Sequence, residues 1–437
     1  MRVGRCVGRV TLAMFTPRFY GSSKRPDPQL MRFCTLAANA SSTACSECSW
    51  WSPPSLIRPL DKQSGAEPRK PTLAWFFCIT QPSSGWSSSR SFVDLARVAA
   101  LSGRLNAPSL APYMVYLHPP NEAPQTDEFT RFLEAIGVRA IHHNLTFWDT
   151  VAASPFGTHS PVKMGSYCRL DLPQLVTGEL NAELRGRALP TDRILYTDTD
   201  VIIGADVRFP VDQPLRTLAA ADEGFGTVGS LNSGVLLMHT SVMVSEFPHF
   251  LDYGKRHKFH FQVHDQSWMD KYYRDSNRGL ATRLGGFDNS TALPATRRWH
   301  LLDRAIYNGR PFEHPLGNTT TTSEVVLPSI WHWQGFKPPD VACWAQAMET
   351  GRFPWRHDDL LRHPAVTGCP KHDARWPFRW RRCSLHTYAR LYGQHLLLLA
   401  LSRQIGLKVE DGRPVRLTRA VHAFVESEAA LNGTILV

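Results

Sequence analysis

RILYTDTDVIIG, residues 193–204, has the pattern of a buried β-strand but carries two acids within it. Apolar residues come before and after Asp198 and Asp200, which lie two positions apart. Side chains at i and i+2 of a strand point to the same side, so both carboxylates can converge where the strand frays into a loop. Charged groups beside a buried strand are costly unless they are neutralised, and we therefore expect a counter-charge here.

A divalent cation is the counter-charge that suits this pair of acids. The ligands of open α/β sheets bind outside the carboxyl ends of the strands. Carboxylate oxygens suit Mg²⁺ or Mn²⁺, and such an ion then bridges to phosphate oxygens. The alternative is a solvated turn with two surface acids, which the apolar residues on both sides disfavour.

A third ligand is expected from IWHWQGFKPPD, residues 330–340. A neutral imidazole can bind Mn²⁺, which makes His332 a candidate, although taken alone it also fits a packed histidine. Gly335 would let the backbone approach a diphosphate closely. Lys337 would offset phosphate charge as a point cation.

The segments on both sides of this stretch alternate between strand and helix patterns. Residues 72–80 and 112–119 predict strands, whereas 87–103 and 129–138 predict helices, the second ended by Gly137. This alternation is typical of a doubly wound α/β sheet. Later segments are expected to form a strand in 232–240, helices at 245–257, 384–404 and 417–431, and a loop over 288–325.

The net charge of +11 is concentrated at the start of the chain. Residues 1–70 hold eleven Lys and Arg against four Asp and Glu, a charge of +7, so the body need not bind nucleic acid. RWPFRWRRC, residues 375–383, interleaves basic and aromatic residues and leaves nucleic-acid binding as an alternative. A C-terminal surface that packs its tryptophans is favoured, and no nucleic-acid partner is expected.

The sequence signals for the cellular compartment of the protein disagree with one another. The head is rich in Arg and small residues and has no acid before Asp27, which resembles a plastid or mitochondrial transit peptide or a weak secretory signal. N-x-S/T sequons favour the secretory pathway and Golgi lumen, and they occur at Asn39, Asn144, Asn289, Asn318 and Asn432. No run of about 18 apolar residues occurs, so no transmembrane span is expected. Nine cysteines are present, with one weak CxxC zinc signal at Cys45 and Cys48.

Five motifs follow one another in a specific order, namely KMGSYCRLDLP, ILYTDTDVII, LNSGVLLMHT, HDQ and HWQGFKP. In this order they resemble family 8 glycosyltransferases, which are retaining, nucleotide-sugar-dependent enzymes of the GT-A fold. The resemblance covers 72–345 and implies an α/β domain with a GT-A-like mixed, mainly parallel central sheet and flanking helices. Residues 1–71 are then a targeting or disordered segment, and 346–437 are a basic, helical C-terminal extension.

The resemblance also implies a role for each matching residue. Asp198, Asp200 and His332 would hold the metal ion against the donor diphosphate. Asp265 and Gln266 would lie beside the anomeric carbon as catalytic residues. The residues implied to bind the donor are Asn232, Ser233, Gly335, Lys337, Lys163 and Arg169. For the last two, a structural ion pair is an equal alternative.

The implied activity is retaining transfer of a hexose or pentose from a UDP-sugar, with Mn²⁺ or Mg²⁺, to a glycan, protein or small-molecule acceptor. Two departures from the family bear on it, because K-P-W reads K-P-P at 337–339 and SWMD follows HDQ. A catalytically inactive sugar-binding protein of the same fold is therefore one alternative. A haloacid dehalogenase-like phosphatase with Asp198 as nucleophile is another, although its motif normally opens the domain and its downstream G-D-x-x-x-D is missing here.

Overall fold

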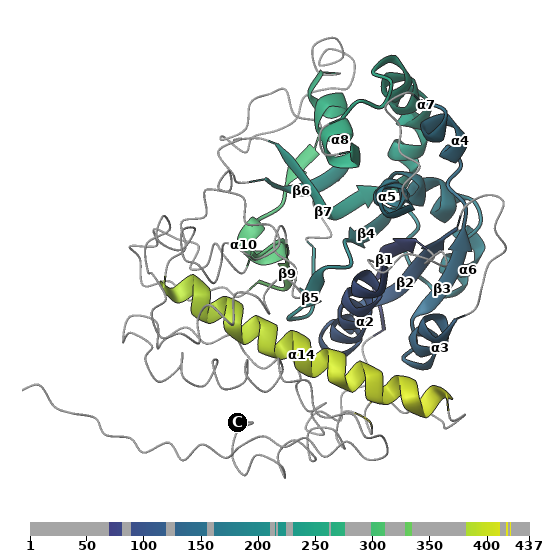
Figure 1. The fold of residues 1–437 in the computed structure, drawn as a ribbon. Coiled ribbons are helices and arrows are strands. Elements are labelled where there is room, and N and C mark those ends of the chain that lie inside the picture. Colours follow the sequence, from purple (N-terminus) through teal and green to yellow (C-terminus); the bar gives the residue numbers. More distant parts are fainter. Residues whose placement is uncertain are drawn as a thin grey trace, which may run out of the picture.

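In a computed structural model of the protein, the described residues form a seven-stranded sheet in the order β3-β2-β1-β4-β7-β6-β8 (Figure 1). The strands are β1 (Leu73–Thr80), β2 (Leu110–Leu117), β3 (Arg139–His143), β4 (Arg193–Thr197), β6 (Leu218–Asp222), β7 (Leu231–His239) and β8 (Trp299–Leu301). Strand β7 is antiparallel to β4 and β6, and the other neighbours are parallel. The expected mixed, mainly parallel sheet is confirmed.

The structure describes part of the chain, including nearly all of the region that forms the sheet and its helices. The described residues are 70–80, 89–118, 127–154, 161–209, 215, 217–223, 230–261, 264–275, 299–310, 328–333, 382–410, 417 and 420. Several residues of the sequence-based predictions lie outside these ranges, namely Cys45, Cys48, Gly335 and Lys337, together with all of 1–69 and of 334–381.

The central strand β1 is buried on both of its faces. Trp75 and Phe77 join one hydrophobic cluster, while Ala74 and Phe76 join the other. A parallel strand that is covered by helices on both sides has no face for polar residues. The run 72–80 is therefore apolar throughout rather than alternating.

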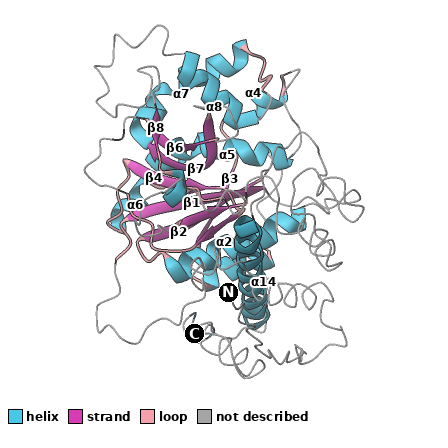
Figure 2. Ribbon diagram, turned by 90° about the vertical axis from the view of Figure 1, so that its left-hand side faces the viewer, coloured by secondary structure: helices cyan, strands magenta, loops and turns pink. Residues whose placement is uncertain are grey.

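Helices cover both faces of the sheet (Figure 2). The helices that join the cluster of Trp75 are α2 (Ser89–Asn106), α3 (Glu128–Ala135) and α14 (Arg382–Glu410). Those that join the cluster of Phe76 are α5 (Pro161–Thr177), α7 (Thr240–Arg256) and α8 (His264–Asp275). Three shorter helices are α4 (Trp148–Ala152), α6 (Asn181–Gly186) and α10 (Arg304–Tyr307). Among the described residues, no helix has both the length and the apolar character needed to cross a membrane.

The strand of 193–204 frays at the two acids as expected, because β4 ends at Thr197 and β5 (Val201–Ile203) begins after a break that holds them. One expectation about an individual element is wrong. Residues 299–310, expected to belong to a loop, contain β8 and α10. These elements have three and four residues, too few for a periodic pattern to be detected.

The long C-terminal helix α14 packs against α2 and α3 and so lies on the same face of the sheet as they do (Figure 1). Its buried leucines belong to the cluster of Trp75. The helix predicted over 384–404 is confirmed and runs from Arg382 to Glu410. Of the second predicted helix, 417–431, only residues 417 and 420 are described, and both are helical.

Cys78 of β1 and Cys168 of α5 form a disulfide, with their Cα atoms 6.3 Å apart. Both residues are buried. The bond ties the carboxyl-terminal part of the central strand to the helix that carries Arg169, a residue of the candidate site described next. No pairing was expected here, because the contact joins cysteines that are 90 residues apart.

Candidate functional site

The two acids of the stretch 193–204 occupy the break between β4 and β5, and backbone hydrogen bonds fix both positions. The Asp198 N–H donates to the carbonyl of Gly234 in β7 at 2.8 Å. The Trp333 N–H, just after β9 (Ile330–His332), donates to the carbonyl of Asp200 at 2.8 Å. The break is therefore held between a strand of the large sheet and a segment that comes from far along the chain.

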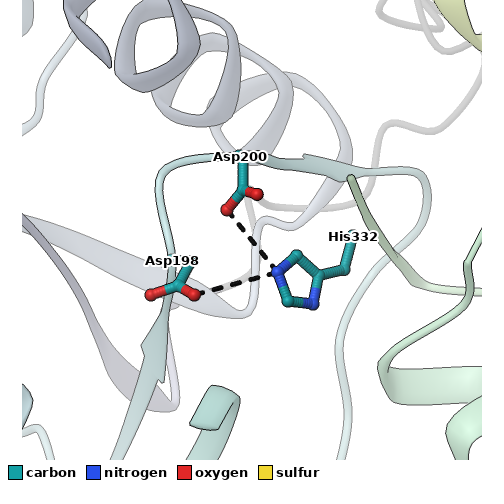
Figure 3. Close-up of side chains that lie close together, drawn as sticks. All are labelled: Asp198, Asp200 and His332. Carbon is teal, nitrogen blue, oxygen red and sulfur yellow. Dashed lines mark ion pairs between the residues drawn. The ribbon is translucent and has the colours of Figure 1, made fainter. Parts of the chain in front are cut away.

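The antiparallel pairing of β5 with β9 brings His332 to this break, because Val201 lies opposite His332 in the ribbon. The ring atom Nε2 is 3.5 Å from Asp200 Oδ1 and 3.8 Å from Asp198 Oδ2 (Figure 3). One ligand atom from each of the three residues lies within 4.8 Å of the others. The structure thus brings the three predicted metal ligands together.

The oxygen and nitrogen atoms of these three side chains fit a divalent cation as ligands. Ligand atoms around one octahedral ion with bonds of about 2.0–2.1 Å lie about 3 to 4 Å apart, and the two distances from Nε2 fall in that range. Two carboxylates and one imidazole suit Mn²⁺, whereas Mg²⁺ prefers oxygen ligands. Asp198, Asp200 and His332 can therefore hold such an ion, and the role of each as a ligand stays a prediction.

Arg169 of α5 contacts both the candidate metal-binding acid Asp198 and a second acid, Asp265. Its Nη2 lies 2.7 Å from Asp198 Oδ1 and its Nε lies 3.2 Å from Asp265 Oδ2. Its guanidinium also stacks over the ring of Tyr196, 4.7 Å from the centroid, and Tyr196 donates to Asp198 at 2.8 Å. Burial opposes the charge of Arg169, but the two carboxylates outweigh burial and raise its pKa. The predicted ion pair of Arg169 is thus present at the predicted donor site.

Asp265 and Gln266 lie at the first turn of α8, and Arg169 contacts Asp265 as well as Asp198. Asp265 is buried, and burial raises its pKa although Arg169 lowers it. Gln266 Oε1 accepts from the N–H of Ser233 at 3.2 Å. The predicted catalytic pair therefore contacts the predicted donor-binding residues.

Glu223, at the end of β6, is a site residue that the sequence analysis missed. Its Oε2 accepts from Asn232 Nδ2 at 2.9 Å and from Gln266 Nε2 at 3.0 Å. Arg310, which is 1% exposed, donates to the Glu223 carbonyl. No motif marks Glu223, and its only signal is an acid directly after the apolar run LAAAD.

Asn308 is a second residue that sequence reasoning missed. It follows α10, is fully buried and contacts His332 Nδ1 through its Oδ1 at 2.8 Å. The segment that carries Asn308 and Arg310 was expected to be a loop. Gly335 and Lys337 are outside the described residues, and Lys163 belongs to α5 without its side chain being described, so their predicted roles stay predictions.

Comparison with protein-family models finds no match to this chain, and comparison with curated proteins finds none either. Among solved structures, the apo-form glycosyltransferase GlyE of Streptococcus pneumoniae TIGR4 matches at 19% identity with a TM-score of 0.38, over 61% of this chain and 56% of GlyE. An active-site mutant of LgtC matches at 17% with a TM-score of 0.39, over 61% of this chain and 89% of LgtC.

Mouse xyloside xylosyltransferase 1 in its apo form matches at 13% identity with a TM-score of 0.37, over 60% of this chain and 98% of that protein. At TM-scores this low, these similarities support no conclusion about the fold or the activity of this protein. The chain spans 56% of the length of GlyE.

The site combines three kinds of group at one edge of the sheet. A cluster of two acids and one imidazole can bind a cation and, through it, phosphate oxygens. The amides of Asn232 and Gln266 lie beside it. The buried Asp265, paired with Arg169, completes the set. Such a set suits breaking a bond between a phosphate and a polar, hydroxylated group.

Proposed function

We propose that the protein is a retaining glycosyltransferase of family 8 that transfers a hexose or pentose from a UDP-sugar in a metal-dependent reaction. The observation that carries this proposal is the meeting of Asp198, Asp200 and His332 at the break between β4 and β5. These residues come from motifs that resemble the family and lie far apart in the sequence. Gly335 and Lys337, which come three and five positions after the end of β9, are proposed to contact the donor diphosphate.

The proposed roles of the metal ion and of Arg169 follow from their positive charges. A divalent ion at this site, Mn²⁺ being proposed because of the imidazole, supplies a Lewis acid that stabilises the departing nucleoside diphosphate. Arg169 holds Asp198 through Oδ1 and leaves Oδ2 on the side of His332. The orientation of the first acid is thus fixed before any donor binds, as preorganised catalysis requires.

The sugar is proposed to lie next to Asp265, Gln266, Asn232 and Ser233. Positive charge develops on the sugar ring as its bond to the diphosphate breaks. A carboxylate and amide oxygens near the ring would stabilise that charge, and the adjacent positions of Asp265 and Gln266 in α8 support this assignment. We propose Asp265 and Gln266 as the catalytic pair, and a glycan, protein or small molecule as acceptor.

The test is a panel of UDP-sugars assayed for UDP release and for transfer, with Mn²⁺, with Mg²⁺ and with chelator. One UDP-sugar should support turnover that requires the metal. Asp200→Asn should lower that turnover roughly 100-fold or more and weaken Mn²⁺ binding, because it removes a charged ligand of the ion. Asp252→Asn, on the exposed face of α7, is the matched control and should leave turnover unchanged.

Other outcomes separate the alternatives. Nucleotide-sugar binding without hydrolysis or transfer would favour an inactive sugar-binding protein. Trapping of a covalent phospho-aspartate at Asp198 would favour the phosphatase. Full turnover in the presence of chelator would overturn the proposed use of a metal ion.

We further propose that the protein works in the secretory pathway, in the Golgi lumen. The Cys78–Cys168 disulfide supports this, because such bonds persist in oxidising compartments. The sequon residue Asn144 is exposed after β3, where a glycan can be attached. Expression in eukaryotic cells should give an endoglycosidase-sensitive form that Asn144→Gln makes smaller. Import into plastids or mitochondria without a glycan would contradict the proposal.

A further inference from the structure

Behind His332, polar side chains form a hydrogen-bonded chain that ends at a carboxylate. Its members are His332, Asn308, Asn232 and Glu223. Asn308 is 0% and Asn232 is 1% exposed, so their amide groups find their partners within the protein. In such a chain, the direction of one hydrogen bond fixes the direction of the next.

Glu223 sets that direction. A carboxylate can only accept hydrogen bonds, so the Asn232 side chain must present its NH₂ group to Glu223 Oε2, 2.9 Å away. The Asn232 oxygen then faces the opposite way. The Gly234 N–H donates to this oxygen at 3.1 Å, which fixes the same amide orientation independently.

The donor and acceptor positions of Asn232 in turn fix those of Asn308 and of the His332 ring. Asn232 Oδ1 is an acceptor, so Asn308 presents its Nδ2 to it at 2.8 Å. Asn308 Oδ1 therefore faces His332 Nδ1 at 2.8 Å. An amide oxygen cannot donate, so Nδ1 carries the proton of the neutral ring and Nε2 carries the lone pair.

The other side of the ring agrees with this assignment. His332 Nε2 is 3.5 Å from Asp200 Oδ1 and 3.8 Å from Asp198 Oδ2. Both distances are longer than an ordinary N–H···O hydrogen bond, in which the heavy atoms lie roughly 2.7–3.2 Å apart. They are the spacing of ligand atoms around a cation rather than of a donor and its acceptor.

We propose that Glu223 and Asn308 are positioning residues that hold His332 in the tautomer protonated at Nδ1, which leaves Nε2 to bind a divalent cation. The proposal rests on the proposed function, because it takes these hydrogen-bonded side chains to orient His332 for the proposed metal site. Glu223 acts from three hydrogen bonds away from the ring. Arg310 secures Glu223 by donating to its carbonyl and by lying 3.9 Å from its Oε2.

Two measurements on the full chain test the proposal. The first is the tautomer of His332 in the metal-free protein, obtained from long-range ¹⁵N–¹³C NMR correlations of ¹⁵N-labelled histidine. The resonance of His332 is the one that His332→Ala removes. The second is the affinity for Mn²⁺ alone, measured by electron paramagnetic resonance. The variants are Asn308→Leu, Asn308→Asp and Glu223→Gln.

Asn308→Leu should lose the Nδ1–H tautomer and weaken Mn²⁺ binding about 10- to 100-fold, the usual effect of losing a partner of a metal ligand. Asn308→Asp keeps an acceptor beside Nδ1 and should retain the Nδ1–H tautomer, although its carboxylate can no longer donate to Asn232 Oδ1. Glu223→Gln keeps the shape of the side chain but can also donate, so both properties should be weakened, though less than in Asn308→Leu, because the Gly234 N–H still orients Asn232. Glu134→Gln, on the exposed face of α3, is the matched control and should change neither.

The proposal is overturned if the wild-type ring carries its proton on Nε2 or if Asn308→Leu keeps the wild-type tautomer, and full retention in Glu223→Gln would overturn the role of Glu223. Unchanged melting temperatures would show that the variants are folded. A wild-type ring protonated at Nδ1 that shifts in Asn308→Leu and Glu223→Gln, in a protein that does not bind Mn²⁺, would support the positioning chain. That same result would refute the metal-dependent function.

Discussion

Gly234 sits where the imidazole of His332 needs space. A Cβ atom at this position would lie 2.8 Å from both ring nitrogens of His332, closer than real Cβ contacts. The carbonyl of the same residue accepts from the Asp198 N–H. The glycine of the LNSG motif therefore supports the proposed metal site in two ways, because its missing side chain leaves space for His332 and its carbonyl holds Asp198.

Gly234→Ala should consequently damage the metal site more than the fold. The new methyl group would push the His332 ring away from Asp198 and Asp200, and we expect Mn²⁺ affinity to fall at least about 10-fold. Overpacking should lower the free energy of unfolding by only about 1–3 kcal/mol. Mn²⁺ titration and denaturant unfolding measure the two effects separately.

The matched control is Gly186→Ala, where nothing lies within 4 Å of the added Cβ. It should leave Mn²⁺ affinity at its wild-type value and should not lower the free energy of unfolding. Wild-type Mn²⁺ affinity in Gly234→Ala would mean that the ring of His332 is not a ligand in the observed position.

At the scale of elements, the Cys78–Cys168 disulfide joins β1 to α5, and α5 places Arg169 between Asp198 and Asp265. A cross-link between residues 90 apart removes many conformations from the unfolded chain. Loop-closure entropy for such a loop corresponds to about 4–5 kcal/mol, although measured values are often smaller.

Removing this bond should lower the stability of the whole domain. We expect Cys78→Ser/Cys168→Ser to lose about 2–5 kcal/mol of unfolding free energy, measured by urea unfolding. A reductant should lower the melting temperature of the wild-type protein and leave that of the double variant unchanged. A reductant effect of equal size on both proteins would show that it acts elsewhere.

Helix α14 carries a histidine that should make the fold sensitive to acid. His395 packs edge-on against the ring of Trp333, which directly follows the proposed ligand His332. Burial first, and then the charge of Arg403, lowers the pKa of His395 to about 3. An ordinary histidine has a pKa of about 6.5, so the fold holds this ring in its neutral form.

The direction of the pH dependence follows from these two pKa values. Above about pH 6.5, neither the folded nor the unfolded chain is protonated at His395, so its contribution is complete and constant. Between about pH 6.5 and pH 3, the unfolded chain takes up a proton that the folded chain does not. The free energy of unfolding therefore falls as the pH is lowered, by at most about 1.4 kcal/mol per unit.

His395→Phe should accordingly reduce the loss of stability between pH 7 and pH 5, as measured by urea unfolding at both values. His249→Phe, at an exposed position of α7, supplies the comparison and should keep the wild-type pH dependence. Identical acid sensitivity in wild type and His395→Phe would show that the buried ring does not control it.

For the molecule as a whole, the sequence predicts those structural features that a long local pattern or a motif encodes. The apolar run of β1 and the paired acids at 198 and 200 were recognisable because they carry a period or a motif. Glu223, Asn308 and the disulfide were not, because each acquires its role from a partner far along the chain. Short elements such as β8 and α10 gave no periodic signal.

The C-terminal extension predicted from residue 346 gives rise to a last prediction about the whole molecule. In α14, Leu401 is fully buried in the cluster of Trp75, whereas Leu407 is 63% exposed. If α14 belongs to the same folding unit as the sheet, Leu401→Ala should cost about 2–5 kcal/mol in one unfolding transition. Leu407→Ala on the same helix should cost no more than about 0.5 kcal/mol.

Urea unfolding followed by tryptophan fluorescence distinguishes this from an independent extension, because Trp75 lies in the core of the sheet. A single transition that moves to lower urea in Leu401→Ala, with far-ultraviolet circular dichroism moving together with it, means that the sheet and α14 unfold together. Two transitions, with only the first changed by Leu401→Ala, would mean that α14 unfolds separately. In that case the support that α14 gives to α2 and α3 would not be needed to hold the site together.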